Sequence, residues 1–396
     1  MLSKESPSPV IRTRDGILDL VRGLSALLVM LGHLRGFVFE DFGDLKNVGI
    51  FTRIFYFATG LGHQAVMVFF VLSGYFVGGS VLNAIRNNCF AWDRYSLARL
   101  ARLWVVLVPA LLFTLAIDKL GSSYCPGAYS GEFHGQFMSG PSLIAPASYG
   151  WTTFLANLGF VQSIASPVFG SNGPLWSLSN EFWYYVLFPL AATMRFPVRV
   201  GRPKPVLLLA NAFKFALSVV LLWCLPKGLL LFGLVWILGV GVWWVSEWRG
   251  VMALTQNWMW RIACGGLFIA SLGFSKTGGW MGSDCAVGIT FALWLPSLLG
   301  TWPRRGWWTS LATGLSEFSF TLYVIHFPLL FFASAVILKG QQFPPNAYGL
   351  LLFAGLALVT VIFSALMWWL FERNTDFLRR MVQRRFEEQI GVEVGP

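Results

Sequence analysis

Long apolar stretches separated by short polar segments recur along this 396-residue chain. Each runs for roughly 17 to 25 residues, the length that a helix needs to cross about 30 Å of hydrocarbon with its backbone hydrogen bonds made internally. The pattern therefore predicts an all-α integral membrane protein, a bundle of about ten transmembrane helices. The expected spans are 17–38, 61–82, 98–117, 174–193, 206–225, 228–246, 259–275, 284–300, 317–338 and 347–371.

The segments between the spans indicate one domain. No long polar linker divides the spans and no internal repeat is visible, so residues 16–371 are expected to form one transmembrane domain between cytoplasmic segments 1–15 and 372–396. The charged tail is expected to form an amphipathic helix on the inner membrane surface. The longest loop is 118–173, and its apolar stretch 151–165 is too short to span and is predicted to be re-entrant or interfacial.

Composition excludes a soluble globule, because 56% of the residues are hydrophobic and 12% are charged. The net charge of +11 would fit a nucleic-acid partner, but the basic residues fall in alternate loops and so explain the charge without one. By the positive-inside rule both termini are cytoplasmic, which agrees with an even number of spans. We expect a multi-pass protein of a cell membrane, in particular a bacterial inner membrane. The residues that set this orientation are Lys4, Arg12, Arg14, Arg86, Arg94, Arg99, Arg195, Arg199, Arg202, Lys204, Arg249, Arg304, Arg305, Arg373, Arg379, Arg380, Arg384 and Arg385.

Ionisable side chains inside spans are expensive in free energy, so each is a functional hypothesis. His33 and His326 are the histidines, among four in the chain, that lie deep in predicted spans. Arg22 and His33 are eleven residues apart, which returns them to nearly the same helix face roughly 16 Å apart along the axis. Asp15 and Asp19 share that stripe. The alternative is that the charged residues are interfacial anchors and His33 is a packing residue.

Three further clusters carry polar groups in apolar surroundings. Ser73 lies in FFVLSGY, where a Ser-Gly pair permits close helix approach. Arg94, Arg99 and Arg102 lie at the entrance to the third span and either anchor it or bind the phosphates of a nucleotide-bearing donor. Glu181 follows Asn180 near the outer end of its helix and needs a buried partner such as an imidazole or a bound hydroxyl.

The last predicted polar face contains Ser319, Tyr323 and His326. By contrast, His63 and His134 lie at a helix mouth and in a loop, and neither is expected to be catalytic. The five cysteines have no metal-ligand spacing, and no metal site is indicated. Whether Cys125 and Cys285, both expected to face outward, form a disulfide is left open.

These segments, in this order, resemble the membrane-bound acyltransferase 3 family, which O-acylates surface and exported glycans. The resemblance covers about residues 16–371. The spacing from Arg22 to His33 is similar to that family's signature of Arg and His separated by ten residues. Similar to its other recurrent segments are FFVLSGY, RLARLWVVLVP, PLWSLSNEFWYYVLFP and SFTLYVIHFP.

The resemblance implies an O-acyltransferase that moves an acyl group, most simply acetyl, from acyl-coenzyme A to a hydroxyl of a glycan or glycolipid. The donor would be a co-substrate, with no bound cofactor, and the other partners would be the acceptor and the lipid bilayer. His33 would be the principal catalytic residue, Arg22, Arg99 and Arg102 would lie on the donor side, and Glu181 and His326 would line the same pore. The residues expected to line or support that pore are Asp19, Ser73, Asn180, Tyr323 and His326.

Physical reasoning permits these roles. A neutral imidazole could take the proton from the acceptor hydroxyl as it attacks a thioester, and a carboxylate, by hypothesis Glu181, could fix the imidazole's tautomer. The alternative is a multi-pass transporter or flippase for a glycan or lipid-linked substrate, in which the same buried residues form a proton or substrate pathway. A noncatalytic membrane scaffold is a third possibility, and it predicts that His33 is dispensable.

Overall fold

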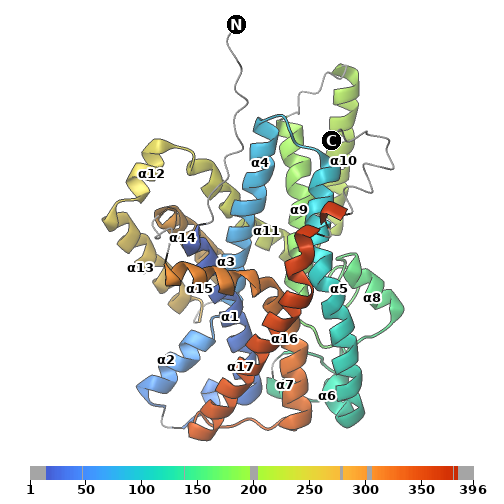
Figure 1. Ribbon diagram of the computed structural model, residues 1–396, viewed down its shortest axis with the longest axis vertical. Helices are drawn as coiled ribbons and strands as arrows, with labels where there is room; N and C mark the ends of the chain where they lie inside the picture. The colour runs from blue at the N-terminus through green and yellow to red at the C-terminus, as the bar shows by residue number, and fades with distance from the viewer. Residues whose placement is uncertain are drawn as a thin grey trace.

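The computed structural model describes residues 15–46, 48–137, 139–196, 204–276, 280–300, 306–377 and 379–381. Across these ranges the chain is a bundle of helices, with isolated β-bridges and no β-strand (Figure 1). The all-α fold predicted from the apolar pattern is confirmed. Most of the predicted amphipathic tail, residues 382–396, lies outside the described ranges, as do the basic residues of the first fourteen positions.

The described helices include α-helices, two 3-10 turns (η1 and η4) and two π-helical segments (η2 and η3). Their bounds are α1 Gly16–Val38, η1 Phe42–Asp44, α2 Ile50–Thr59, α3 Gly62–Ser73, η2 Gly74–Gly78, α4 Gly79–Arg86, α5 Trp92–Tyr124, α6 Pro126–Ser130, α7 His134–Phe137, α8 Trp151–Leu158, α9 Leu175–Arg195, α10 Lys204–Cys224, α11 Lys227–Val245, α12 Arg249–Thr255, α13 Trp258–Phe274, α14 Trp280–Leu298, α15 Trp307–Glu317, α16 Ser319–Phe332, η3 Ala333–Ile337, α17 Ala347–Leu370 and η4 Glu372–Asn374.

Each of the ten predicted spans coincides with a helix or a continuous run of helices. Seven helical segments in the described part of the chain are long and apolar enough to cross a membrane. The helices α9, α13 and α14 are not among those seven, so the count of ten spans stays a prediction. The segments that qualify are Gly16–Val38, Ile50–Arg86, Trp92–Tyr124, Pro205–Cys224, Lys227–Val245, Ser319–Ile337 and Ala347–Met381.

The sequence did not predict the short helices between the spans. The loop 118–173 contains α6, α7 and α8, and the apolar stretch 151–165 is helical only as far as Leu158. The helix α15 crosses the bundle beside the start of α1 (Figure 1). Asp15, expected on the polar stripe of α1, instead caps that helix: one carboxylate oxygen accepts from the Ile17 amide at 3.3 Å and the other from the Gly300 amide at 2.8 Å.

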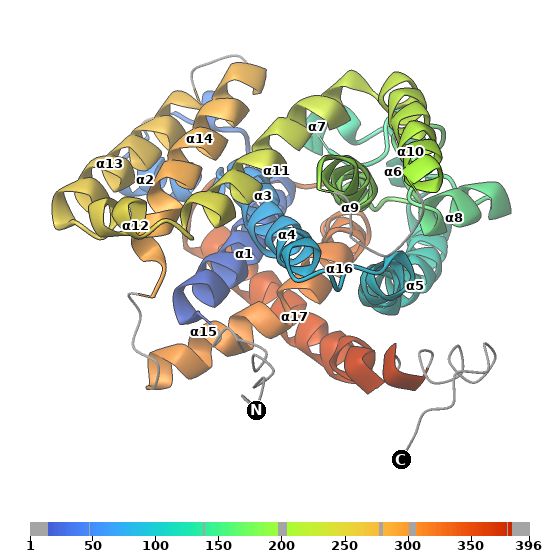
Figure 2. The same ribbon diagram turned by 90° about the horizontal axis from the view of Figure 1, so that it is seen from above.

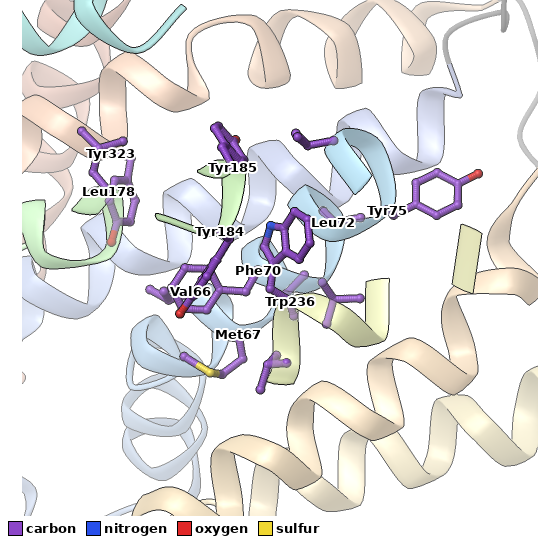
Figure 3. Close-up of a cluster of buried hydrophobic side chains, with 14 of the residues drawn as sticks. Val66, Met67, Phe70, Leu72, Tyr75, Leu178, Tyr184, Tyr185, Trp236 and Tyr323 are labelled. Carbon is purple, nitrogen blue, oxygen red and sulfur yellow. The ribbon is translucent and has the colours of Figure 1, made fainter. Parts of the chain in front are cut away.

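The helix α3 occupies the middle of the bundle, packed against α1, α11 and α14 (Figure 2). On the other side of α1, α16 lies between α1, α5 and α17. Figure 3 shows the buried side chains where α3, α9 and α11 meet, with Trp236 of α11 among the largest fully buried residues. The core therefore gathers around the helices that contain the predicted functional residues.

Two glycines allow α3 and α11 to touch backbone to backbone. A Cβ atom added at Gly74 would lie 1.9 Å from the carbonyl oxygen of Trp236, and one at Gly239 would lie 1.9 Å from the carbonyl oxygen of Val71. Close approach through small residues is how helices pack in membranes. At this crossing the helical run changes to the π-helix Gly74–Gly78, directly after Ser73.

All five cysteines are free, including Cys125 and Cys285. The pairing that the sequence left open is therefore absent from the structure. In the described residues, no group of three or more His, Cys, Asp or Glu side chains is arranged to hold a metal ion.

We predict that Gly239→Ala destabilises the protein. Because the added methyl group would overlap the Val71 carbonyl, the two helices must separate, at a cost of about 1–3 kcal/mol. Thermal unfolding in detergent measures the change. Gly241→Ala, on the same helix but with open space at its Cβ, is the control and should leave the unfolding temperature unchanged or slightly raised. Equal unfolding temperatures for the two variants would contradict the close crossing.

Candidate functional site

Two cavities, each of about 330 Å³, lie next to each other inside the bundle. We call the first the arginine cavity, because Arg22, Arg99 and Arg102 line it together with Glu181. We call the second the histidine cavity, because His33 and His63 line it. Val66 and Tyr323 line both.

In the arginine cavity, Arg22 is held from two helices. Its guanidinium donates to Asp19 at 3.2 Å, one turn earlier on α1, and to the Ser316 hydroxyl on α15. Ser316 in turn donates to Asp19 at 2.9 Å. Asp19 thus holds Arg22, and Ser316 is a partner that the sequence did not reveal.

Arg99 and Arg102 reach the same cavity from α5. The Arg99 guanidinium lies 5.5 Å from the ring centre of Tyr95 and 5.9 Å from that of Tyr185, and its Nε is buried without a hydrogen-bond partner in the described residues. Three guanidinium groups and one carboxylate, that of Glu181, therefore line the cavity, and Arg22 is already paired with Asp19 outside the lining. Such a cavity favours an anionic ligand.

Glu181 faces the arginine cavity and is bound by hydroxyl groups. It accepts a hydrogen bond from Ser73 at 2.7 Å and another from Tyr185, one turn later on α9. Trp236 donates its indole N–H to Ser73 at 3.1 Å. The partners of Glu181 are therefore the hydroxyl groups of Ser73 and Tyr185 rather than the imidazole of His33.

In the histidine cavity, His33 pairs with a second imidazole. Its Nδ1 lies 3.0 Å from Nε2 of His326, and Nδ1 of His326 lies 3.0 Å from the Leu322 carbonyl oxygen. A carbonyl oxygen can only accept, so Nδ1 of His326 carries hydrogen. With both rings neutral, Nε2 of His326 accepts from Nδ1 of His33, and the lone pair of His33 is on Nε2.

The hypothesis that Glu181 fixes the tautomer of His33 is wrong in this structure, because His326 takes that position. The sequence identified both histidines, but their separation of 293 residues concealed the contact. Glu181 and His33 line different cavities, and His326, expected in the same pore as Glu181, is not among the described residues lining either cavity. Asn180 is buried on α9 and is not among the described residues lining either cavity.

Tyr323 forms part of the wall shared by the two cavities. Its hydroxyl lies 2.6 Å from the Ser177 hydroxyl, and its ring lies 5.8 Å from Phe69 and 6.1 Å from His326 between ring centres. Figure 3 shows Tyr323 beside Leu178, apart from the Trp236 side of the cluster. Tyr323 thus lies between the two cavities, and its predicted role in lining or supporting the pore stays a prediction.

The loop before α9 is tied to the helices that carry these residues. Asp118 accepts from the amide of Ser171 at 2.6 Å and from its hydroxyl at 2.8 Å. Next to it, Asn172 donates to the Val324 carbonyl of α16 at 2.9 Å, two residues before His326. These bonds fix the start of α9 against α5 and α16.

Sequence reasoning missed a second hydrogen-bonded histidine at the histidine cavity. Nε2 of His63, at the start of α3, lies 2.9 Å from Oδ2 of Asp284 on α14. The sequence places His63 at a helix mouth and predicts no catalytic role for it. The signal that was present is Asp284 itself, a carboxylate inside an apolar helix, which requires a buried partner.

Comparison with known proteins gives one match. The model of a family described as an acyltransferase domain matches residues 15–369, nearly the whole chain. No curated protein and no solved structure was found to match.

We predict that Ser73→Ala destabilises the protein, because it leaves the Trp236 indole N–H without an acceptor and removes one donor to Glu181. The expected loss is about 1–3 kcal/mol, measured by thermal unfolding in detergent. Ser218→Ala is the control, since the Ser218 hydroxyl donates only to the Lys214 carbonyl of its own helix. If the two variants unfold at the same temperature, the Ser73 hydroxyl does not join these helices.

Proposed function

Since the chain belongs to the acyltransferase 3 family, we propose that this multi-pass membrane acyltransferase moves an acyl group, most simply acetyl, from acyl-coenzyme A to a hydroxyl of a surface or exported glycan or glycolipid. The family identifies an enzyme that transfers groups other than aminoacyl groups. The identities of the donor, the acceptor and the transferred acyl group are our proposal.

The observation that carries the proposal is the pair formed by His33 and His326. Their hydrogen bond leaves Nε2 of His33 as a proton acceptor in the histidine cavity. A general base must lie within hydrogen-bond reach of the proton that it removes, and a cavity beside the imidazole admits a hydroxyl to that position.

The proposed reaction is a direct transfer. The acceptor oxygen attacks the thioester carbonyl while its proton moves to Nε2 of His33. A carbon–oxygen bond forms, the carbon–sulfur bond breaks, and the departing thiolate takes the proton back from His33. During the step His33 is an imidazolium whose Nδ1–H still donates to His326, so His326 positions and stabilises the charged ring.

The arginine cavity is the proposed donor site. Coenzyme A carries phosphates, which guanidinium groups bind strongly through paired hydrogen bonds. The apolar wall contributed by Phe69, Leu72 and Phe76 suits the less polar arm of the donor. The shared wall at Tyr323 is where the thioester would approach the histidine cavity.

The two cavities follow one another along α1. Arg22 lines the arginine cavity in the first half of the helix, and His33 lines the histidine cavity eleven residues later. With the N-terminus in the cytoplasm, the donor enters from the cytoplasmic side and the acceptor from the outer side of a bacterial inner membrane. This orientation rests on the positive-inside rule.

We predict that His33→Ala abolishes ester formation. Loss of the base should lower the transfer rate on the order of 10²–10⁴-fold. The measurement is mass spectrometry and proton NMR of glycans from cells with the intact chain, His33→Ala or no copy, with protein levels matched. His134→Ala is the control, because His134 lies on α7 and is not among the described residues lining either cavity.

The same experiment includes His326→Ala, which should lose at least about tenfold in rate, the equivalent of 1.36 kcal/mol of transition-state stabilisation. Normal esters in His33→Ala would contradict the proposal. Glycans of unchanged composition that accumulate on the wrong side of the membrane would indicate transport instead.

We predict that Arg99→Gln and Arg102→Gln each raise the KM for acetyl-coenzyme A about tenfold, since a hydrogen bond to a charged group contributes about 1.5–3 kcal/mol. Inside-out membrane vesicles with radiolabelled acetyl-coenzyme A give the measurement. Arg94→Gln is the control, because Arg94 is exposed on α5 and is not among the residues lining the cavity. An unchanged KM in both variants would place the donor elsewhere.

A further inference from the structure

The histidine cavity holds a second imidazole that the proposed reaction does not use. Nε2 of His63 lies 2.9 Å from Oδ2 of Asp284. The Asp284 side chain is 2% exposed and the His63 side chain is 44% exposed. The carboxylate is therefore buried behind the ring, and the ring is open to the cavity that it lines.

A close helix crossing brings His63 to the same cavity as His33. A Cβ at Gly32 would lie 3.5 Å from the Cα atom of Gly62, and one at Gly62 would lie 3.4 Å from the Leu28 carbonyl oxygen. The backbones of α1 and α3 thus meet at these glycines, and each histidine follows its glycine directly in the chain. The two imidazoles therefore enter the cavity from the two sides of one crossing.

In each imidazole, one nitrogen contacts another side chain of the protein, and the second nitrogen is left for a ligand. His33 uses Nδ1 toward His326, and His63 uses Nε2 toward Asp284. Nδ1 of His63 has no hydrogen-bond partner in the described part of the chain. In a neutral ring this nitrogen accepts a hydrogen bond, and in an imidazolium it donates one. A hydroxyl serves either state, because it both donates and accepts.

The rest of the cavity suits a ring with apolar faces. The Trp176 ring is stacked on His63, with ring centres 6.4 Å apart and planes inclined by 30°, and Phe327 forms another wall. Arg35 is the one permanently charged residue among the described lining residues, and none of them is a carboxylate. Aromatic walls with a few fixed polar groups fit the alternating apolar and hydroxyl surfaces of a sugar.

We propose that His63, held by Asp284, binds a second hydroxyl of the acceptor while His33 acts on the first, so that His63 decides which hydroxyl is acylated. The acceptor is then a ring with at least two hydroxyls within reach of both imidazoles, rather than a simple alcohol. This inference rests on the proposed function. Asp284 is a positioning residue, since it acts through His63.

The test is the position of the ester on the product. Glycans are isolated from cells that express the intact chain, His63→Ala, His63→Gln or Asp284→Asn, and two-dimensional NMR assigns each acylated carbon. The intact chain should give one dominant position. His63→Ala should spread the ester over two or more positions and lower its occupancy severalfold. His63→Gln, whose amide can bind a hydroxyl, should retain more of the selectivity, and Asp284→Asn should fall between the intact chain and His63→Ala.

His134→Ala is again the control and should leave position and occupancy unchanged. A single position at full occupancy in His63→Ala would overturn the inference and leave the proposed function standing. Complete loss of ester from His63→Gln at normal protein level would also overturn it, by placing His63 in the chemical step. No ester on any glycan with the intact chain would remove the proposed function and this inference together.

Discussion

The hydrogen bond between His33 and His326 is the interaction on which the rest of the site depends. It joins α1 to α16 through two side chains that are 293 residues apart in the chain. A polar ring inside an apolar bundle needs a partner, since unsatisfied polar groups there raise the free energy by several kcal/mol. Here the partner also sets the tautomer, because the Leu322 carbonyl orders His326 and His326 orders His33. The same contact therefore packs α1 against α16 and orients the imidazole of His33.

Small residues make that geometry possible. Gly32 and Gly62 bring α1 and α3 into backbone contact beside the histidine cavity, and Gly74 and Gly239 do the same for α3 and α11 beside the arginine cavity. Close backbone approach strengthens van der Waals packing where the bilayer supplies no hydrophobic driving force. At the first crossing, Gly32 and Gly62 themselves line the histidine cavity. The four glycines thus hold α3 at the centre of the bundle.

The two cavities differ in the chemistry of the side chains that line them. The arginine cavity is lined by three guanidinium groups and by one carboxylate, Glu181, that is held by Ser73 and Tyr185. The histidine cavity offers two imidazoles and aromatic walls, with Arg35 as the one permanently charged residue among its described lining residues. An anionic ligand and a polyhydroxy ligand would be attracted to different spaces, with Tyr323 between them. Under the proposed function, this division would let one bundle bind two unlike substrates and bring them together at the wall that the cavities share.

The sequence by itself determined the helices and most of the residues worth testing, because the length of apolar stretches and the rarity of ionisable groups inside them are local properties. The positions of Arg22, His33, Glu181 and His326 followed from that rule. Only the tertiary structure decided which of them meet. Glu181 accepts hydrogen bonds from Ser73 and Tyr185 and does not contact His33. His63, which the sequence did not single out, lies within hydrogen-bond distance of Asp284. Helical periodicity specifies the face on which a residue lies, whereas the partner across the interface depends on how the helices cross, and here buried glycines distant in the sequence set that crossing.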